Sequence, residues 1–339
     1  RKLPLHLKNK GLKIHNSNLC NEIHLPTSKD RSAVCCLSSL NLELYEEWKD
    51  SCIVGDLITF LDNVLQFFID NAPDTLSKAR YSATRERSLG LGAMGFHYLL
   101  QKEGLPFGSR EAMQLNRKVF QGIKSQAEAM TLSLGWLKGP YQDCSHPRGP
   151  RNAHLLAIAP NANNSIILGT SASIEPIAAN AYTHRSRIGS HLIKNKYLEE
   201  LLEVTGHNTK DVWDDIIAND GSVQQLDFLS DTDKEVYKTA DEIDQCDVVD
   251  QARIRQTYIC QGQSVNLFFK SGADPKYVND VHLRAFAPTG HGSPLKGLYY
   301  LRTENGKKTD KLTEKKERVA LQDGEVPRNP DIQCVGCEG

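Results

Sequence analysis

Short apolar runs that alternate with helical segments constrain the fold of this chain more than any other feature. Four runs have the length of a buried strand: Ala33–Leu42, His154–Ala159, Ser264–Phe269 and Gly297–Leu301. Helical periodicity marks the segments between or beside them: Leu57–Asp70, Glu111–Leu134 with Gly135 as its stop, the acidic region 195–250, and Pro275–Phe286 after Asp274. Strands separated by helices predict an α/β architecture with parallel strands.

Charge and composition exclude several classes of protein. The formal net charge of -1 argues against nucleic acid as the main partner. No run approaches the roughly 18 apolar residues of a membrane helix, and the basic start broken by Pro4 does not resemble a secretory signal. Nine cysteines in a chain of 339 residues do not form a disulfide framework. We therefore expect a cytoplasmic protein, in the host cytoplasm if it is viral, in which some thiols work as thiols.

Cys20 lies two residues after Asn18 and two before Glu22. In an extended or looped segment these three side chains share one face. A carboxylate beside a thiol disfavours the thiolate, which argues against an ordinary cysteine nucleophile and favours a cysteine that loses a hydrogen atom. Glu22 would then be free to act as a base on a substrate hydroxyl. The alternative is a cysteine packed in the core.

Two further groups of cysteines stand apart from Cys20. Cys35 and Cys36 are neighbours on a predicted strand, so they point to opposite faces and only one can face a given cavity; core packing is the alternative for either. Cys334 and Cys337 follow a polar segment rich in Lys and Glu, which predicts a flexible tail. A single pair of cysteines makes a poor zinc site, so we favour a redox dithiol over metal binding and expect no metal site.

Two other motifs are weaker when taken alone. Tyr299-Tyr300 is typical of strand packing. The segment that begins at Pro160 and runs through Asn161 to Ser165 is a polar turn after a strand, and such a turn can present backbone N–H groups to a phosphate. Many polar turns open helices without binding a ligand.

Taken together, these motifs resemble the large subunit of class I ribonucleoside-diphosphate reductase, and the phosphate-loop region is most similar to the T4-like bacteriophage type. The residues that carry the resemblance are Ser17–Ile23 with Leu25–Thr27, Val34–Leu42, Leu89–Gly92, Ala159–Ser165 with Ser173–Pro176, Gly262–Leu267 and Lys296–Thr303. Their order and spacing extend over the whole chain.

The resemblance implies a role for each matched cysteine and its neighbours. Cys20 would be the transient thiyl radical that takes the 3′ hydrogen of the ribose. Glu22 would be the base on the 3′ hydroxyl, and Asn18 would hydrogen-bond the ribose hydroxyls. Cys35, rather than Cys36, would be one member of the dithiol that reduces the substrate.

The remaining roles come from the same resemblance. Tyr299 and Tyr300 would carry the radical to Cys20, and Cys334 with Cys337 would re-reduce the active-site disulfide. The substrate-binding residues would be Ser17 and the diphosphate loop Asn161, Ala162, Asn163, Asn164 and Ser165. We expect the other cysteines to be packing residues: Cys36, Cys52, Cys144, Cys246 and Cys260.

The resemblance also implies a fold and a division of the chain. Residues 1–305 would form the finger loop and the second half of a ten-stranded α/β barrel, with a helix-rich insertion at about 182–260. Residues 306–339 would be the flexible tail. The family's large subunit is longer, so the partner of Cys35 would lie in an upstream half. Because a half barrel exposes an apolar sheet edge, we expect a separate chain to supply that N-terminal half.

The implied substrate is a ribonucleoside diphosphate, and the chain itself would bind no cofactor. A diiron-tyrosyl small subunit would supply the radical, and thioredoxin or glutaredoxin would supply the reducing dithiol. Two alternatives stay open. A cobalamin-dependent reductase of the same barrel family would not need Tyr299-Tyr300. A non-catalytic remnant that only binds the small subunit would not need Cys20, Glu22 and Cys35 intact.

Overall fold

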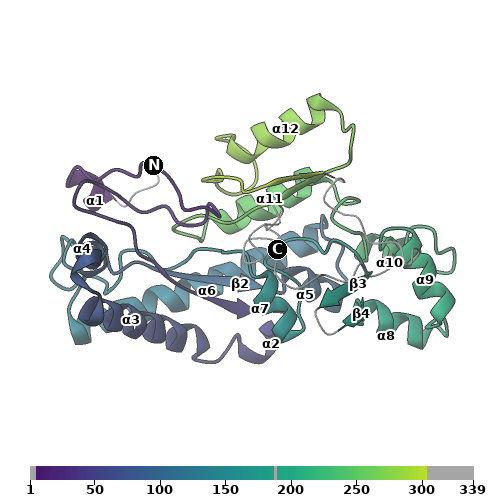
Figure 1. Ribbon diagram of the computed structural model, residues 1–339, viewed down its shortest axis with the longest axis horizontal. Helices are drawn as coiled ribbons and strands as arrows, with labels where there is room; N and C mark the ends of the chain where they lie inside the picture. The colour runs from purple at the N-terminus through teal and green to yellow at the C-terminus, as the bar shows by residue number, and fades with distance from the viewer. Residues whose placement is uncertain (1–4, 187–188, 304–339) are drawn as a thin grey trace, which may run out of the picture.

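The computed structural model describes residues 5–186 and 189–303, and its sheet is a row of parallel strand segments (Figure 1). β1 (Cys36–Asn41) pairs with β2 (Leu89–Met94), and β5 (Leu267–Phe269) pairs with β6 (Leu301–Thr303). Between these pairs, parallel bridges join Leu91 to Leu156 and Ile158 to Gln263. The predicted α/β architecture with parallel strands is confirmed, and closure into a ten-stranded barrel stays a prediction.

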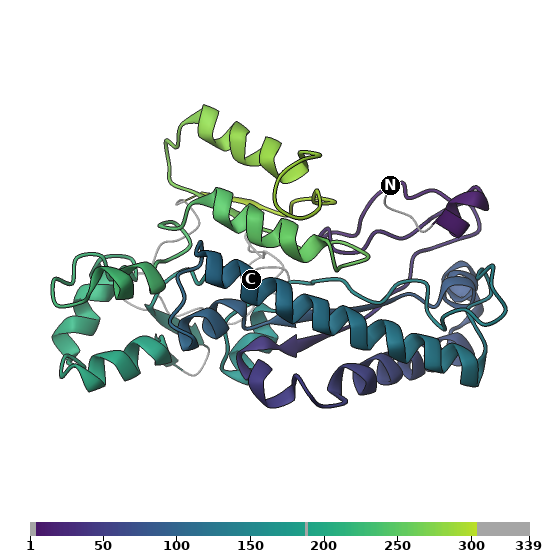
Figure 2. The same ribbon diagram turned by 180° about the vertical axis from the view of Figure 1, so that it is seen from behind.

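Helices cover this row of strands. In chain order they are α1 (Leu5–Asn9), α2 (Tyr45–Trp48), α3 (Ile53–Asn71), α4 (Ser77–Glu86), α5 (Phe96–Lys102), α6 (Arg110–Lys138), α7 (Ala162–Leu168), α8 (Lys196–Val204), α9 (Lys210–Ala218), α10 (Asp231–Val236), α11 (Gln245–Gln256) and α12 (Pro275–Phe286), with 3-10 turns η1 (Leu42–Leu44) and η2 (Asp74–Leu76). α3 lies against β1 and β2 with α6 beside it, while α11 and α12 pack together and α11 contacts β5 (Figure 2).

α3 shows why the sequence forms this layer. Ile58, Leu61 and Leu65 recur at helical spacing and are buried. They belong to one core with Leu40 of β1 and Leu91 of β2. Burying each such side chain contributes about 1.5–3 kcal/mol to folding. The helix predicted over Leu57–Asp70 is therefore confirmed. It holds β1 in place, and β1 begins directly after Cys35.

α6 corrects one prediction. The helix runs through Gly135 and ends at Lys138, before Gly139, whose φ is 84°. A Cβ atom at residue 135 would lie 2.1 Å from the Gly149 carbonyl oxygen. Gly135 is thus a packing residue that lets the 149–151 loop cross the helix, and the predicted stop at this position was wrong.

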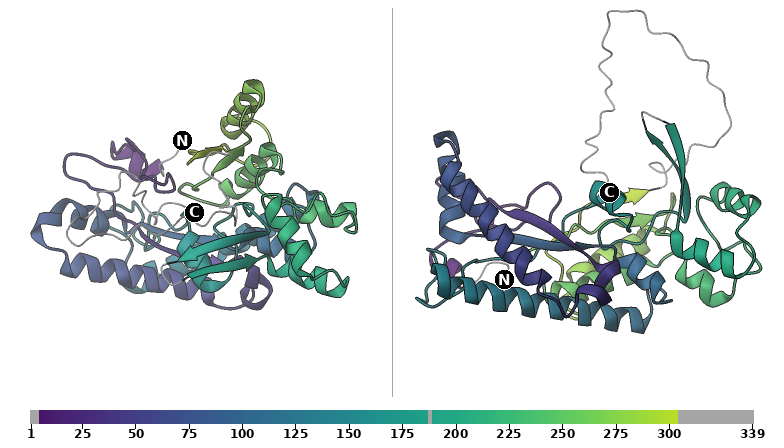
Figure 3. Two further views of the ribbon diagram at one scale, coloured as in Figure 1. Left: turned by 45° about the vertical axis from the view of Figure 1, so that its right-hand side comes forward. Right: turned by 90° about the horizontal axis from the view of Figure 1, so that it is seen from below.

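Residues 181–240 form a unit with its own core at one end of the molecule. β3 (Ala181–Ser186) and β4 (Gly189–Lys194) make an antiparallel hairpin, which the sequence did not indicate (Figure 3). Around it, the buried side chains are Leu198, Leu202, Trp213, Ile216, Val223 and Tyr237. Thr209 and Ser230 cap α9 and α10, because their side chains accept from backbone N–H groups at the starts of these helices. The predicted insertion bounds stay a prediction.

The two tyrosines precede the strand on which they were predicted, since β6 begins at Leu301. Their backbone still joins the sheet: the Tyr299 N–H donates to the Val265 carbonyl at 2.8 Å, and the Leu267 N–H donates to the Tyr300 carbonyl at 2.9 Å. No single helix within the described ranges is long and apolar enough to cross a membrane; the pair formed by residues 42–48 and 53–71, bent by 113°, meets those two criteria together.

Candidate active site

Cys20 lies in a closed turn formed by residues 18–23. The Asn18 N–H donates to the Ile23 carbonyl at 3.2 Å, and the Ile23 N–H donates back to Asn18 Oδ1 at 3.0 Å. Asn21 adopts the left-handed region with a φ of 64°, which asparagine tolerates better than most residues. Its Nδ2 donates to the Leu298 carbonyl at 2.5 Å. This bond ties the turn to the segment that carries the tyrosines.

The three residues of the predicted Asn18, Cys20, Glu22 pattern do converge. Asn18 Nδ2 donates to Glu22 Oε1 at 2.7 Å. Ser264 Oγ lies 3.2 Å from Glu22 Oε2 and 2.5 Å from the Cys20 carbonyl oxygen. Only 2% of Glu22 is exposed, so its carboxylate is held by specific hydrogen bonds instead of bulk water. The site therefore joins a thiol, a carboxamide and a buried carboxylate within one short turn.

Tyr299 connects this turn to the protein surface. The Cys20 thiol donates to Tyr299 Oη at 3.5 Å, although 279 positions separate the two residues. The rings of Tyr299 and Tyr300 have centroids 3.9 Å apart. Tyr300 is 41% exposed, while Tyr299 and Cys20 are half-buried. The three side chains form a continuous path from solvent to the thiol.

The phenol of Tyr299 is held in its neutral form. Burial, together with its contacts to Tyr300 and Cys20, raises the pKa of Tyr299 well above its ordinary range. At neutral pH the phenol of this residue therefore keeps its proton. A neutral phenol beside a thiol suits the exchange of a hydrogen atom better than the exchange of a bare proton.

Cys35, the residue before β1, is held in the same region by Gln261. Gln261 Nε2 lies 3.5 Å from Cys35 Sγ, and Gln261 Oε1 accepts from the His24 N–H at 3.3 Å. Burial raises the pKa of the Cys35 thiol, the hydrogen bond from Gln261 opposes that rise, and the nearby charge of Glu22 adds to it. A Cβ atom at Gly90 would lie 3.1 Å from Cys35 Sγ, so glycine leaves room for the thiol.

The structure separates Cys35 from Cys36 as predicted. Cys35 packs with Ile23 and Leu25, which follow the Cys20 turn. Cys36 packs against the main core. Alternation along the strand puts the two thiols on opposite faces, and only Cys35 faces the Cys20 turn.

The predicted diphosphate loop forms the start of α7. Asn161 precedes the helix and is buried, and its Oδ1 accepts from Ser39 Oγ at 3.1 Å. Ser165 is also buried, because its Oγ turns back to the Ala162 carbonyl at 2.7 Å. Asn163 and Asn164 remain exposed. Cys35 directly precedes β1, and Ser39 lies within it.

Three cavities surround these elements. Asn161 and Asn164 line one of about 410 Å³ with Ser38 and Ser39. Ser17 lines a different cavity of about 830 Å³, so the structure does not bring it to the 161–165 loop.

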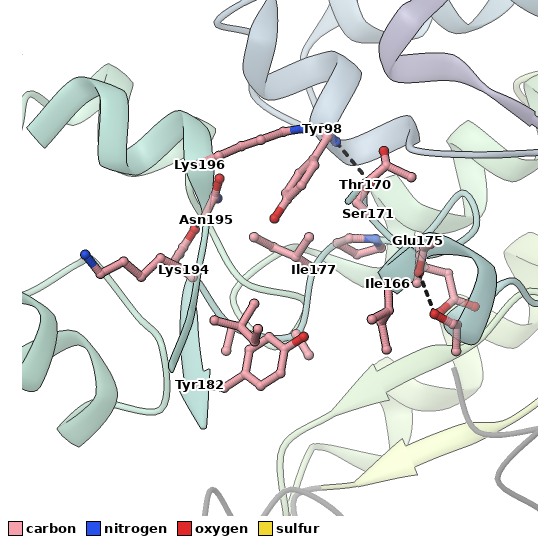
Figure 4. A pocket seen from close by; sticks show the side chains of 18 of the residues that line it. Tyr98, Ile166, Thr170, Ser171, Glu175, Ile177, Tyr182, Lys194, Asn195 and Lys196 are labelled. Carbon is pink, nitrogen blue, oxygen red and sulfur yellow. Dashed lines mark hydrogen bonds between the residues drawn. The ribbon is translucent and has the colours of Figure 1, made fainter. Parts of the chain in front are cut away.

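The third cavity, of about 700 Å³, lies beyond α7 and takes in Ala162 and Ser165. In Figure 4, Ile166 and Thr170 face it from one side and Tyr182 of the hairpin from another, while the Lys194 side chain extends away from it. Glu175 also lines it, and burial raises the pKa of Glu175 to about 7.

Sequence reasoning gave no role to Gln261, Ser264 or Ser39, although all three touch predicted site residues. Their signal was present, since Gln261 and Ser264 are polar residues beside an apolar strand. Cys334 and Cys337 lie outside the described residues, and their role stays a prediction.

Comparison with known proteins points in the same direction as this geometry. The chain matches the family "Ribonucleotide reductase, barrel domain" over residues 4–147 and 144–301. A protein of Frog virus 3 (isolate Goorha) is 50% identical over 338 residues, which cover 98% of this chain and 57% of that protein. The ribonucleoside-diphosphate reductase large subunit of Invertebrate iridescent virus 3 is 45% identical over 317 residues, which cover 92% of this chain and 49% of that protein. The chain thus spans about half the length of these curated relatives.

A solved structure shares the fold and much of the sequence. The Actinobacillus ureae class Id ribonucleotide reductase alpha subunit matches with a TM-score of 0.80 and 38% identity, covering 89% of this chain and 56% of that one. The resemblance inferred from the motifs is confirmed, while the T4-like bacteriophage type stays a prediction. The family match across nearly all described residues shows that this chain belongs to the ribonucleotide reductase barrel-domain family.

Proposed function

We propose that this chain is the catalytic C-terminal part of a ribonucleoside-diphosphate reductase large subunit. The contact between Cys20 Sγ and Tyr299 Oη at 3.5 Å, with Tyr300 packed against Tyr299, carries the proposal. A tyrosyl radical at Tyr299 can take the hydrogen atom of the Cys20 thiol, which restores the phenol and leaves a thiyl radical. This exchange changes no net charge, so a half-buried site does not oppose it.

The neighbouring residues then support reduction of the ribose. The Cys20 thiyl takes the 3′ hydrogen, and Glu22 takes the proton of the 3′ hydroxyl. The 2′ hydroxyl leaves as water, and a dithiol that includes Cys35 supplies two electrons and becomes a disulfide. Cys20 finally returns the hydrogen atom to the 3′ carbon. The balance is one ribonucleoside diphosphate and one dithiol giving a deoxyribonucleoside diphosphate, a disulfide and water.

The arrangement of β1 and α7 supports a nucleoside diphosphate as substrate. Cys35 directly precedes β1, and Ser39 of β1 donates to Asn161 at the start of α7. The ribose would lie near the thiols, and the diphosphate would lie at the backbone N–H groups of residues 161–165. Ser17 lines the other cavity and directly precedes the 18–23 turn. It would contact the substrate only from that position.

The proposed partners follow from the relay. Tyr300 is the exposed end of the path, so a radical-generating small subunit with a diiron-tyrosyl centre would dock there. Further large-subunit sequence, the N-terminal half, would supply the second thiol for Cys35, and thioredoxin or glutaredoxin would reduce the tail cysteines in the cytoplasm. The class I name of the structural relative favours this scheme over a cobalamin-dependent enzyme.

The test is reduction of ribonucleoside diphosphates by the large subunit that contains this chain, assembled with the small subunit. Wild type should form the deoxy product, and Cys20→Ser should form none while folding and assembling normally, because an O–H bond is too strong for a tyrosyl radical to break. Serine is close to cysteine in size, so packing should change little. Turnover by an assembled Cys20→Ser complex would refute the radical role. A wild-type complex that binds the small subunit but reduces nothing would support the non-catalytic alternative.

A further inference from the structure

We propose that Ser264 is a positioning residue that couples the protonation of Glu22 to the backbone of Cys20. The inference rests on the proposed function, since it assigns Glu22 and Cys20 the roles of base and radical thiol. Ser264 would touch neither the substrate nor the reacting atoms. It would act through the two residues that do.

The geometry leaves Ser264 little freedom. The residue is 1% exposed, and its N–H donates to the Ile158 carbonyl at 2.9 Å, which fixes its backbone in the sheet. Two residues earlier, the Gly262 N–H donates to the Glu22 carbonyl at 2.7 Å. Residues 262–264 therefore bind the backbone of the 18–23 turn through Gly262 and bring a hydroxyl to the same turn through Ser264.

The Ser264 hydroxyl has one proton and two neighbouring acceptors. The Cys20 carbonyl oxygen is 2.5 Å from Oγ, whereas Glu22 Oε2 is 3.2 Å away. The shorter contact places the proton on the side of Cys20. The Ser264 oxygen then presents a lone pair to Glu22 Oε2, which is unfavourable when both carboxylate oxygens are unprotonated.

Protonation of Glu22 changes this balance. Glu22 Oε1 already accepts from Asn18 Nδ2 at 2.7 Å, so Oε2 is the oxygen left to carry a proton received from the substrate. A proton on Oε2 can be donated to Ser264 Oγ. A continuous chain then forms, in which Glu22 donates to Ser264 and Ser264 donates to the Cys20 carbonyl.

This chain of hydrogen bonds would form at the step of the reaction that requires it. After Glu22 has taken the substrate proton, Cys20 must hold its position to return the hydrogen atom to the 3′ carbon. Small displacements slow hydrogen transfer, and after that step the Cys20 thiyl must also take a hydrogen atom back from Tyr299 Oη, 3.5 Å from its Sγ. Fixing the Cys20 carbonyl at that moment limits such displacements.

The test compares wild type with Ser264→Ala, Ser264→Thr and Ser293→Ala in the assembled reductase. Ser293 is a matched control, because its hydroxyl contacts the Thr257 hydroxyl at 3.3 Å and lies outside the 18–23 turn. The measurements are kcat, KM, the thermal midpoint and the isotope effect of 3′-deuterated substrate. For Ser264→Ala we expect kcat to fall about tenfold or more, KM to stay within about twofold, and the isotope effect to rise. Ser264→Thr keeps the hydroxyl and should recover most of the activity.

Three results would overturn the inference. One is a Ser264→Ala enzyme with wild-type kcat and isotope effect. Another is a loss of activity that follows a lower thermal midpoint or a higher KM with no change in the isotope effect, because that marks a merely structural residue. The third is a folded Ser264→Thr enzyme as slow as Ser264→Ala. If wild type itself forms no deoxy product, the proposed function fails instead, so the two failures are distinguishable.

Discussion

At the scale of single residues, the site depends on side chains whose partners are far away in sequence. Tyr299 reaches Cys20, Gln261 reaches Cys35, and Ser264 reaches Glu22. The order of exposure gives the relay a direction, because Tyr300 is open to solvent and Tyr299 is less so. A radical that enters from outside meets the residues in the order Tyr300, Tyr299, Cys20.

We predict that Tyr299→Phe and Tyr300→Phe each stop turnover without weakening substrate binding. Phenylalanine keeps the ring but has no O–H to exchange a hydrogen atom or a coupled proton and electron. Deoxynucleotide formation and substrate affinity are measured with the small subunit present. Substantial activity in either variant removes the relay assignment, and a large loss of affinity indicates a packing role.

Gln261 makes a second prediction at this scale. Its buried amide accepts from the His24 N–H and donates to the Leu89 carbonyl at 2.9 Å as well as to Cys35. Gln261→Met keeps the volume but leaves both backbone groups without this partner, so the free energy of unfolding should fall by roughly 1–3 kcal/mol. Urea unfolding of the variant measures this change. An unchanged free energy would show that neither backbone group depends on the amide.

At the scale of elements, sequence periodicity predicted the parts that one element determines by itself. α3 and α12 follow from local pattern, and the structure confirms them. Sequence periodicity did not predict the features that contacts between elements determine. The pattern in α6 cannot show that Gly135 makes room for the 149–151 loop, and the helical signal after residue 195 hides the β3–β4 hairpin before it.

The predicted site divides in the same way. Asn18, Cys20 and Glu22 are close in sequence, so their spacing was enough to predict that they lie together. The choice of Cys35 over Cys36 needed only alternation and the resemblance. Gln261 and Ser264 could not be assigned, because nothing in a single strand indicates which distant turn it will face.

A buried ion cluster that joins α4 to the segments on either side of it gives a prediction at this scale. Asp143 is buried and pairs with Arg31 at 2.6 Å, with Lys10 at 3.1 Å, and with Arg85. Burial alone would raise the pKa of Asp143, but the hydrogen bonds from Arg85, Arg31 and Lys10 outweigh it and lower the pKa to about 2.

The sign of the pH effect follows from that shift. The pKa of Asp143 is below its ordinary value of 3.8, so folding favours the carboxylate and the stabilisation is complete above about pH 4. It should be lost as the pH falls through about 2, by on the order of 2 kcal/mol. Glu86, whose pKa burial raises to about 7, acts in the opposite sense as the pH rises from about 4.5. Urea unfolding between pH 5 and pH 2 should show a smaller acid loss for Asp143→Asn than for wild type. Equal losses would contradict the assignment.

At the scale of the whole molecule, two segments that are distant in sequence meet at the 18–23 turn. The turn is bound to the strand after α11 through Ser264 and to the segment before β6 through Asn21. Cys35 directly precedes β1, at the other end of the row of strands. Assembly of the site therefore requires the complete row, and the proposed catalysis would require a source of radical at Tyr300 and a source of electrons for the dithiol.

The last prediction concerns that source of electrons. The sequence places Cys334 and Cys337 beyond a polar stretch of roughly 30 residues, and a flexible coil of that length spans on the order of 30 Å. Such a tether would let the pair exchange disulfides with the active site and with an external reductant in turn. Gly336 between the two cysteines would let their short ring close without strain.

Replacing both residues, Cys334→Ser with Cys337→Ser, should abolish multiple turnover supported by thioredoxin or glutaredoxin. A single turnover from pre-reduced enzyme should survive, because Cys35 and its partner thiol still hold two electrons. Dithiothreitol is small enough to reach the site and should partly restore cycling. Normal cycling of the double variant with the protein reductant would exclude a shuttle. Loss of even the single turnover would mean instead that the pair holds the site together, and dithiothreitol would then restore nothing.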